Sequence, residues 1–415
     1  MPTDLKDRLA SLYRVGQVIN SSLVLDEVLS LAIDNLIEVT GAERGAILLL
    51  DGQGDLVVRA ARSLDHTTLT GQSFQTSRNI LREVASTGTP RLISDASREL
   101  PTFDSVLMHR LISVLCAPLM VRGAVRGVLY VDHRLTTGAF TDDDLELLEA
   151  FAGQAAVAIE NARMYQELAE QERQRRELEI ARSIQASLMP SHLPAPAGFE
   201  LAAACVPARH VGGDFYDALS PTGLETVLFL GDVSGKGVPA ALLMGMVRTV
   251  LRSEVQRGAS LAEAVRQCNR TLYDDFVATG TFATLVLGRI DPKAGEVSYV
   301  NCGHCEPMLW ERESQCLQEL SGDAPPLGIL EELETVERTV RLRPGDVLVI
   351  YSDGFSEAKA ASGERFGIAR LAEAVRTLAR LPAQTILDEI GNAVDRFVLQ
   401  EAQSDDQTIM VVRAL

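Results

Sequence analysis

A long segment without helix breakers constrains this chain more than any other feature. After Gly153 the sequence contains neither glycine nor proline until Pro190. Thr141 and the three aspartates that follow it are typical of a helix N-terminus, because an N-cap side chain and acidic groups both favour the first turn. The proline-rich segment 189–196 ends the run, since proline cannot continue the helical backbone. The sequence therefore predicts one long helix with a folded domain on either side of it.

One face of this helix carries a weak heptad pattern. Polar Gln171 and Arg175 interrupt the pattern, and most other faces are polar. This combination is consistent with a dimerising, coiled-coil-like signalling helix or with a solvated single helix, and we expect the homodimer. The apolar seam positions are Val157, Met164, Leu168 and Leu178, followed after a shift of register by Ala181, Ile184 and Leu188.

Composition limits the functional classes. The 415 residues are 46% hydrophobic and 23% charged, which is typical of ordinary globular domains, and the net charge of -18 argues against binding to nucleic acid or to anionic membranes. No apolar run approaches the roughly 18 residues of a membrane-spanning helix, and no basic segment followed by an apolar stretch opens the chain. The six cysteines are widely spaced, which favours reduced thiols. We expect a cytoplasmic protein.

The segment before the long helix reads as an α+β domain. A first helix is expected near the N-terminus and a second at 25–36, where apolar residues share one face. Apolar runs at 46–50 and 56–60 flank a Gly- and Asp-rich loop, and runs at 113–121 and 125–132 flank a second turn, so both pairs predict hairpins. A further helix is expected at 77–85.

The segment after the long helix contains about ten short strands, with its helices grouped in pairs. The helices are expected at 239–255 and 260–276, and again at 367–379 and 384–398. Strands are expected at 201–206, 213–219, 226–231, 282–290, 296–301, 307–310, 335–342, 346–351 and 407–413. This order predicts a β-sandwich flanked by helix pairs. The expected organisation is a first domain at 1–165, a helical linker at 166–190 and a second domain at 191–415.

Acidic residues in the second domain occur where apolar strands end or bend. Asp214, Asp232 and Asp353 each adjoin glycine, and Asp405 and Asp406 form a pair. Any one of them alone is more typical of a turn or strand-end cap. Carboxylates that converge would repel one another unless a cation neutralised them, and hard oxygen ligands fit Mg²⁺ or Mn²⁺.

Five motifs in this region resemble the SpoIIE branch of the metal-dependent (PPM) serine/threonine protein phosphatases. In chain order they are Gly-Gly-Asp-Phe-Tyr-Asp, Gly-Asp-Val-Ser-Gly-Lys-Gly, Asn-Cys-Gly-His, Ser-Asp-Gly and Asp-Asp-Gln-Thr, and the resemblance covers about 177–415. It implies that Asp232 bridges two Mn²⁺ or Mg²⁺ ions, with the carbonyl of Val233 on one ion. Asp353 and Asp405 would bind the other ion, and Asp214 would act through water. Asp406 occupies the place of a neighbouring polar residue.

The resemblance also implies a substrate and a mode of control. The substrate would be a phosphorylated anti-anti-sigma (STAS) factor, opposed by a kinase that is also the anti-sigma factor. The helices expected at 239–255 and 260–276 move in regulated members of the family, and we expect the linker segment 180–188 to dock against them. The alternative is a catalytically inactive phosphatase fold that serves as a binding or scaffold protein.

The first domain resembles a GAF sensory domain over about 5–165. The resemblance is carried by Gly-Ala-Glu-Arg-Gly-Ala at 41–46, the strand 113–119, Gly-Val-Leu-Tyr-Val-Asp at 127–132, and Phe140-Thr141 before the long helix. The Asn-Lys and Asp-Glu signature of cyclic-nucleotide-binding members is missing. Small-molecule sensing and a purely structural dimerisation role both remain open. Cys116 is expected in the core and His109 on the surface.

Two further motifs have simpler explanations. Gly231 to Gly237 resembles a phosphate-binding loop, but only three residues separate Gly231 from Gly235, and Gly237 stands where that loop needs Ser or Thr. Lys236 lies either beside the metal site or in a solvated loop. Cys302 and Cys305 form a single C-x-x-C without a second pair, which favours structural cysteines, and His304 is expected to pack against a loop near the site.

Overall fold

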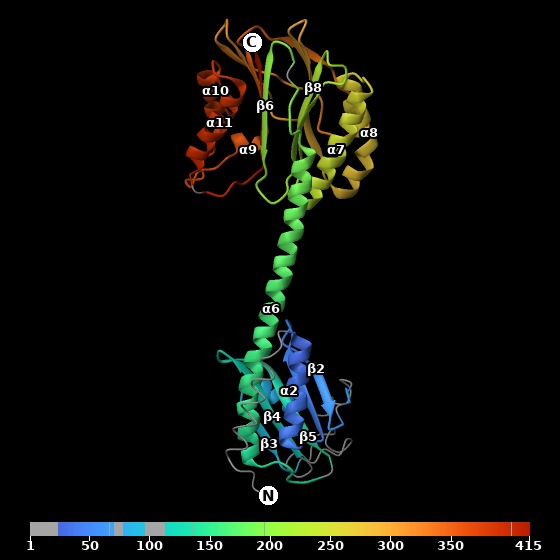
Figure 1. Ribbon diagram of the computed structural model, residues 1–415, viewed down its shortest axis with the longest axis vertical. Helices are drawn as coiled ribbons and strands as arrows, with labels where there is room; N and C mark the ends of the chain where they lie inside the picture. The colour runs from blue at the N-terminus through green and yellow to red at the C-terminus, as the bar shows by residue number, and fades with distance from the viewer. Residues whose placement is uncertain are drawn as a thin grey trace. The chain divides into compact units, whose positions relative to one another are not determined.

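The computed structural model describes residues 24–65, 67–69, 78–95, 113–134, 136–194, 196–399 and 401–415. The expected first helix and His109 lie outside these residues. The chain forms two compact units, which separate after Gln174 within helix α6 (Asp142–Leu188). Figure 1 shows that both units combine helices with antiparallel sheets, as predicted.

The N-terminal unit is built on one antiparallel sheet with the strand order β2-β1-β5-β4-β3. Helix α2 (Leu25–Thr40) and the first part of α6 pack on one face of the sheet, and α3 (Arg78–Thr87) packs on the other. Cys116 is fully buried beside α3, as expected for a core thiol. The strands are β1 (Arg44–Leu50), β2 (Leu56–Ser63), β3 (Arg91–Ile93), β4 (Ser113–Val121) and β5 (Ala124–His133).

The start of α6 has the expected capping chemistry. The carboxylate of Asp144 accepts hydrogen bonds from the backbone N–H of Thr141 at 2.9 Å and from its hydroxyl at 2.8 Å. These bonds satisfy a donor that the first turn would otherwise leave unpaired. The helix then continues for 47 residues.

The C-terminal unit is a sandwich of two antiparallel five-stranded sheets, as predicted. Their strand orders are β13-β10-β9-β8-β7 and β12-β11-β14-β15-β6, and an apolar core fills the space between them. The first sheet contains β7 (Asp214–Leu219), β8 (Thr226–Val233), β9 (Ala283–Asp291), β10 (Glu296–Cys302) and β13 (Arg338–Arg341). The second contains β6 (Phe199–Val206), β11 (Met308–Glu311), β12 (Cys316–Glu319), β14 (Val347–Tyr351) and β15 (Gln407–Ala414).

Helix pairs cover the outer faces of the sandwich. Helices α7 (Val238–Gln256) and α8 (Leu261–Thr279) pack on the first sheet. Helices α10 (Gly367–Leu378) and α11 (Ala383–Val398), with the short α9 (Asp353–Ser356), pack on the second. Among the residues that the structure describes, no helix is both long and apolar enough to cross a membrane.

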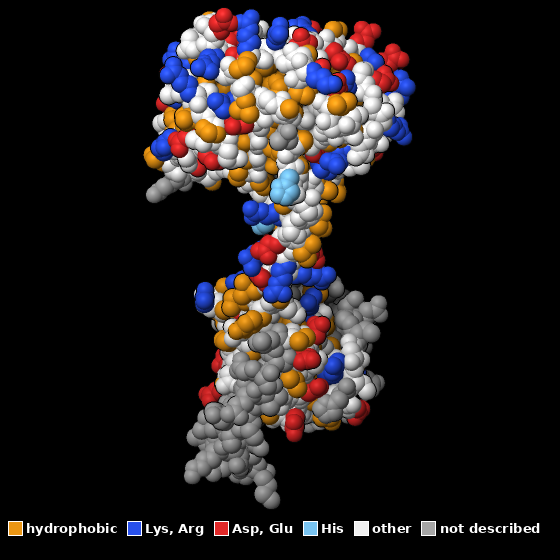
Figure 2. All heavy atoms as spheres, turned by 45° about the horizontal axis from the view of Figure 1, so that its top comes forward, with side chains coloured by type: hydrophobic (Ala, Val, Ile, Leu, Met, Phe, Trp, Pro, Cys, Tyr) orange, Lys and Arg blue, Asp and Glu red, His pale blue; other side chains and the backbone are white. Residues whose placement is uncertain are grey.

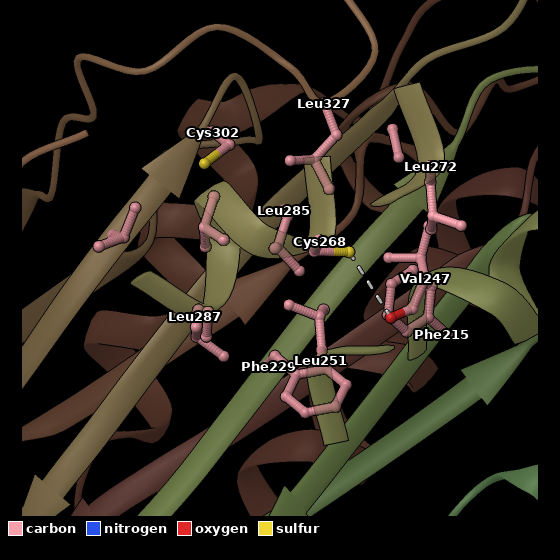
Figure 3. Close-up of a cluster of buried hydrophobic side chains, with 14 of the residues drawn as sticks. Phe215, Phe229, Val247, Leu251, Cys268, Leu272, Leu285, Leu287, Cys302 and Leu327 are labelled. Carbon is pink, nitrogen blue, oxygen red and sulfur yellow. Dashed lines mark hydrogen bonds between the residues drawn. The ribbon is translucent and has the colours of Figure 1, made fainter. Parts of the chain in front are cut away.

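Figure 3 shows the core between α7, α8 and the first sheet. Cys268 and Cys302 lie among its apolar side chains, and the thiol of Cys268 donates a long hydrogen bond to the carbonyl oxygen of Val247 at 3.9 Å. Both thiols are fully buried and free. This supports a structural role for Cys302.

Candidate metal centre

The strands bring the candidate carboxylates to one edge of the sandwich. Asp214 opens β7 and faces Asp232, near the end of β8, directly across the antiparallel ladder. Asp353 follows β14, and Asp405 precedes β15, its antiparallel neighbour, so the end of one strand meets the start of the other. Residues nearly 200 positions apart in sequence therefore face a common space.

The charges of these groups influence one another. Asp214 is 3% exposed, and its pKa is raised well above the usual range by burial and by the charge of Asp232. Burial and the charge of Asp353 raise the pKa of Asp232 to about 7. The pKa of Asp353 is raised by burial and by Asp405. Each carboxylate is thus destabilised in its charged form by the next one.

The side chains fit divalent cations. Atom Oδ2 of Asp214 is buried and accepts no hydrogen bond from the protein. A cation between the carboxylates would relieve their mutual repulsion, and oxygen ligands suit Mg²⁺ or Mn²⁺. Among the described residues, no three Asp, Glu, His or Cys side chains form a ready-made metal site. Backbone carbonyl oxygens and water would therefore have to complete the coordination.

The two adjacent aspartates before β15 have different surroundings. The carboxylate of Asp406 accepts hydrogen bonds at 2.8 Å from the backbone N–H groups of both Ala208 and Gly213. The side chain of Asp405 is 40% exposed, and its Oδ2 lies 2.9 Å from the ammonium of Lys236, which also donates to the carbonyl oxygen of Ser404 at 2.6 Å. The carboxylate of Asp406 is therefore occupied by backbone hydrogen bonds, whereas Asp405 can exchange its lysine partner for a cation. Lys236 lies beside the site, one of its two expected positions.

Glycines allow the chain to approach itself closely around these carboxylates. A Cβ atom at Gly213 would lie 2.3 Å from the carbonyl oxygen of Val233. A Cβ atom at Gly354 would lie 1.9 Å from the carbonyl oxygen of Asp406. Both distances are shorter than van der Waals contact, so only glycine fits. The glycines next to Asp214 and Asp353 thus keep the backbone of the site compact.

His304 lies one strand away from Asp232. Its Nδ1 is 2.6 Å from the hydroxyl of Thr284, which pairs with Asp232 across the sheet, and its backbone N–H donates to Asn301. Burial lowers the pKa of His304 to about 4, so the ring is neutral near pH 7. Burial and the charge of Asp353 raise the pKa of Cys305 to about 12, which keeps it a thiol. His304 therefore orders a loop near the site, as expected.

Sequence reasoning did not identify Gln185, which lies near the end of α6. Its Nε2 donates to the carbonyl oxygen of Gly212 at 2.7 Å, and its Oε1 accepts from the N–H of the same residue at 3.1 Å. Gly212 precedes Gly213 and Asp214, so this side chain holds the segment that leads into the site. A cavity of about 260 Å³ between the helix end and this segment is lined by Gln185 and Asp214, among others. No local pattern distinguishes Gln185 from the polar residues around it.

The end of α6 also packs against α7. Leu188 is partly buried on the core of α7 and α8. Its Cδ1 lies 3.7 Å from the position that a Cβ atom on Gly245 would take. Within the C-terminal unit, the docking expected between 180–188 and these helices is therefore present at Leu188.

Comparison with known proteins finds similarity in both regions of the chain. Residues 222–415 match the family described as Stage II sporulation protein E (SpoIIE), and residues 24–159 match the GAF domain family. Protein IcfG of Synechocystis sp. (strain ATCC 27184 / PCC 6803 / Kazusa) is 32% identical over 265 residues, which cover 57% of this chain and 41% of that protein. Phosphoserine phosphatase RsbU of Bacillus subtilis (strain 168) is 27% identical over 241 residues, 57% of this chain and 70% of RsbU. The chain thus spans less than half the length of the first of these relatives.

One solved structure shares the fold of the C-terminal unit. The SiaA-PP2C domain of Pseudomonas aeruginosa superimposes with a TM-score of 0.53 and 22% sequence identity, over 59% of this chain and 98% of that domain. The similarity shows the fold of this part of the chain.

Proposed function

The chain carries a GAF domain and a SpoIIE-type PP2C phosphatase domain, and from this premise we propose that it is a metal-dependent protein serine/threonine phosphatase. The convergence of Asp214, Asp232, Asp353 and Asp405 at one edge of the sandwich carries the proposal. A protein without catalytic function would gain nothing from this mutual repulsion. The RsbU relative, named as a phosphoserine phosphatase, supports the same activity.

We assign the residues as follows. Asp232 would be shared by two Mn²⁺ or Mg²⁺ ions, the carbonyl oxygen of Val233 would serve one of them, and Asp353 and Asp405 would hold the other. Asp214 would act through water. When bound, the ions would make water more acidic and neutralise charge on the phosphoryl group that it attacks.

The chain itself orients the site and offers cationic contacts. Asp406 fixes the backbone of Gly213, which places Asp214 opposite Asp232. Lys236 uses two of its three N–H donors on Ser404 and Asp405, so one donor remains for a phosphate oxygen. This lysine would help a protein of net charge -18 to accept an anionic substrate.

The proposed substrate is phosphoserine or phosphothreonine of a protein, and within that class a STAS-domain anti-anti-sigma factor. An opposing kinase that is also the anti-sigma factor would complete the switch. The names of the relatives support the phosphoserine chemistry, and the resemblance of the motifs supports the partner.

We propose that the GAF domain controls the phosphatase through α6, with or without a small-molecule ligand. The bonds from Gln185 to Gly212 and the contact of Leu188 with α7 support this route, because both join the helix end to segments that shape the site. In this scheme 1–165 senses, 166–190 transmits and 191–415 catalyses. Val157, Met164, Leu168 and Ile184 are 45–60% exposed on α6, which supports a homodimer along this helix.

Phosphate release by the full chain tests the catalytic proposal. The substrates are a phosphoprotein and a generic aryl phosphate, each assayed with Mn²⁺ and with chelator. We expect chelator-sensitive turnover that Asp232→Asn reduces by at least a hundredfold, whereas Asp388→Asn, on the exposed face of α11, leaves it unchanged. Turnover that survives both chelator and Asp232→Asn would refute the metal mechanism. A cellular effect that persists in Asp232→Asn would favour the scaffold alternative.

A second experiment tests the contact between Gln185 and the site. Gln185→Ala removes both bonds to Gly212, so we expect the Mn²⁺ concentration for half-maximal activity to rise several-fold. Gln174→Ala, at an exposed position of the same helix away from the seam, serves as the control. An unchanged Mn²⁺ requirement in Gln185→Ala would contradict a positioning role.

A further inference from the structure

A second polar cavity lies at the opposite end of β14 and β15 from the carboxylates. Gly345, two residues before β14, and Arg413, near the end of β15, belong to its wall, whereas Asp353 and Asp405 flank the other ends of these strands. The cavity has a volume of about 460 Å³. Arg312 after β11 and the C-terminal end of α10 complete the wall. It is therefore separate from the metal centre.

Four arginines and no carboxylate line this cavity. They are Arg312, Arg376, Arg380 and Arg413. In Figure 2, Lys and Arg side chains gather at the upper left of the C-terminal unit, on the side where Figure 1 shows α10 and α11. Such a concentration of positive charge runs against the net charge of -18 for the whole chain. Like charges at close range are unfavourable unless an anion compensates them.

Among the residues that the structure describes, two of these arginines have acidic partners. Arg376 pairs with Glu373, and Nη1 of Arg413 lies 3.2 Å from Glu200. Within the described parts of the chain, Arg312 and Arg380 form no ion pair. Two arginines of the cavity therefore have no acidic partner among the described residues.

Two further details favour an anion in this cavity. The Nε of Arg413 is buried and has no hydrogen-bond partner, which leaves a costly unsatisfied donor next to the cavity. The nearby carboxylate of Asp346 accepts from the backbone N–H groups of Arg312 and Arg343, and it lines a neighbouring cavity instead of this one. Nothing acidic among the lining residues would repel an anion.

We propose that this cavity binds a small molecule that carries phosphate groups. Guanidinium groups match phosphate oxygens in a bidentate geometry, and several of them together favour a multiply charged anion. The volume falls within the range of small-ligand sites and exceeds what one phosphate group needs. The inference does not depend on the proposed phosphatase activity, because it involves none of the residues of the metal centre.

Trp310 provides a direct reporter. It is the only tryptophan of the chain, it is 5% exposed, and it belongs to the wall of the cavity. Its fluorescence therefore reports on this cavity without labelling.

Titration of the full chain with inorganic pyrophosphate and with orthophosphate tests the proposal. Chelator removes metal-dependent anion binding at the carboxylates, and constant ionic strength excludes general screening. The test variant is Arg312→Ala/Arg380→Ala. The charge-matched control is Arg257→Ala/Arg266→Ala, whose arginines pair with glutamates on α7 and α8. Thermal unfolding checks that both variants fold, and calorimetric titration measures binding independently of fluorescence.

We expect saturable binding of at least one of the two anions. The dissociation constant should rise at least tenfold in Arg312→Ala/Arg380→Ala and stay unchanged in the control. Equal affinity in the test variant and the unaltered chain would overturn the proposal. So would the absence of a saturable signal in both fluorescence and calorimetry. If the chain shows no phosphatase activity but still binds the anion at the arginine-lined cavity, the proposed activity is refuted and the binding site is not.

Discussion

Replacement of Asp232 by asparagine should stabilise the metal-free protein while it abolishes function. Asp232 faces Asp214 across the sheet and feels the charge of Asp353, and these surroundings raise its pKa from 3.8 to about 7. A carboxylate whose pKa is raised on folding opposes folding once it is ionised. Asparagine keeps the shape and removes the charge. Its amide can also donate to the unpartnered Oδ2 of Asp214.

The sign and size of the effect follow from linkage. Well below pH 3.8, Asp232 is protonated in both the folded and the unfolded state and does not affect stability. Between pH 4 and pH 7 the unfolded chain releases the proton more readily, so the folded state loses stability, and above pH 7 the loss is complete. A shift from 3.8 to about 7 corresponds to roughly 4 kcal/mol, at about 1.4 kcal/mol per pKa unit. We therefore expect Asp232→Asn to be more stable by up to ~4 kcal/mol at pH 8 in chelator.

Urea unfolding followed by Trp310 fluorescence measures this difference. The only tryptophan lies in the C-terminal unit, so the transition reports on the unit that contains Asp232. The gain in stability should be large at pH 8 and should shrink towards pH 4. Mn²⁺ should raise the unfolding midpoint of the unaltered chain and leave that of Asp232→Asn nearly constant, because ligand binding to the folded state stabilises it.

Two results would refute the reasoning. The first is an Asp232→Asn chain that is equally or less stable than the unaltered chain at pH 8 in chelator, since this would mean that the carboxylates do not repel one another. The second is a gain in stability that does not depend on pH, because relief of charge repulsion must fade once Asp232 is protonated.

Four other substitutions test the packing and the assembly. Gly354→Ala places a Cβ atom 1.9 Å from the carbonyl oxygen of Asp406, so it should lower the free energy of unfolding in urea by roughly 3 kcal/mol or more. In contrast, Gly391→Ala lies in a helix and meets no atom within 4 Å, so it should raise the free energy of unfolding by about 0.5–1 kcal/mol. Asp217→Asn leaves two arginines of α7 without their buried partner and should cost about 3 kcal/mol by the same assay. Leu168→Glu, at a position 60% exposed, should turn a homodimer into a monomer in sedimentation without changing the melting temperature of either unit; an unchanged sedimentation coefficient would count against the seam.

Most of the secondary structure could be predicted, because its elements are long or strongly patterned. The hairpins of the first domain and the helix pairs of the second lie within a few residues of their expected positions. Helix α2 extends to Thr40 instead of residue 36 and ends at Gly41, whose φ of 64° stops the helix. The missed elements β3, β12 and α9 have three or four residues each. Such segments are too short for a hydrophobic period, and β12 has no buried face.

The site was only partly predictable for a different reason. The position of each aspartate at a strand end is a local property, so the four candidates could be recognised from the sequence. The distinction between Asp405 and Asp406 is not local, because the N–H groups of Ala208 and Gly213 satisfy Asp406 from almost 200 residues away. The assignment of Asp405 as the ligand rested on the resemblance, and the hydrogen bonds of Asp406 now support it physically.

The segment before Asp214 is anchored from two sides, and this sets the kind of control that α6 can exert. Asp406 holds the N–H of Gly213, and Gln185 holds both backbone groups of Gly212. Loss of the Gln185 anchor leaves the Asp406 anchor in place, so Asp214 remains near Asp232 while the segment gains freedom. A change at the end of α6 should therefore weaken metal binding in a graded way. Loss of Asp406 removes the bond next to Asp214 itself and should abolish activity even with Gln185 intact.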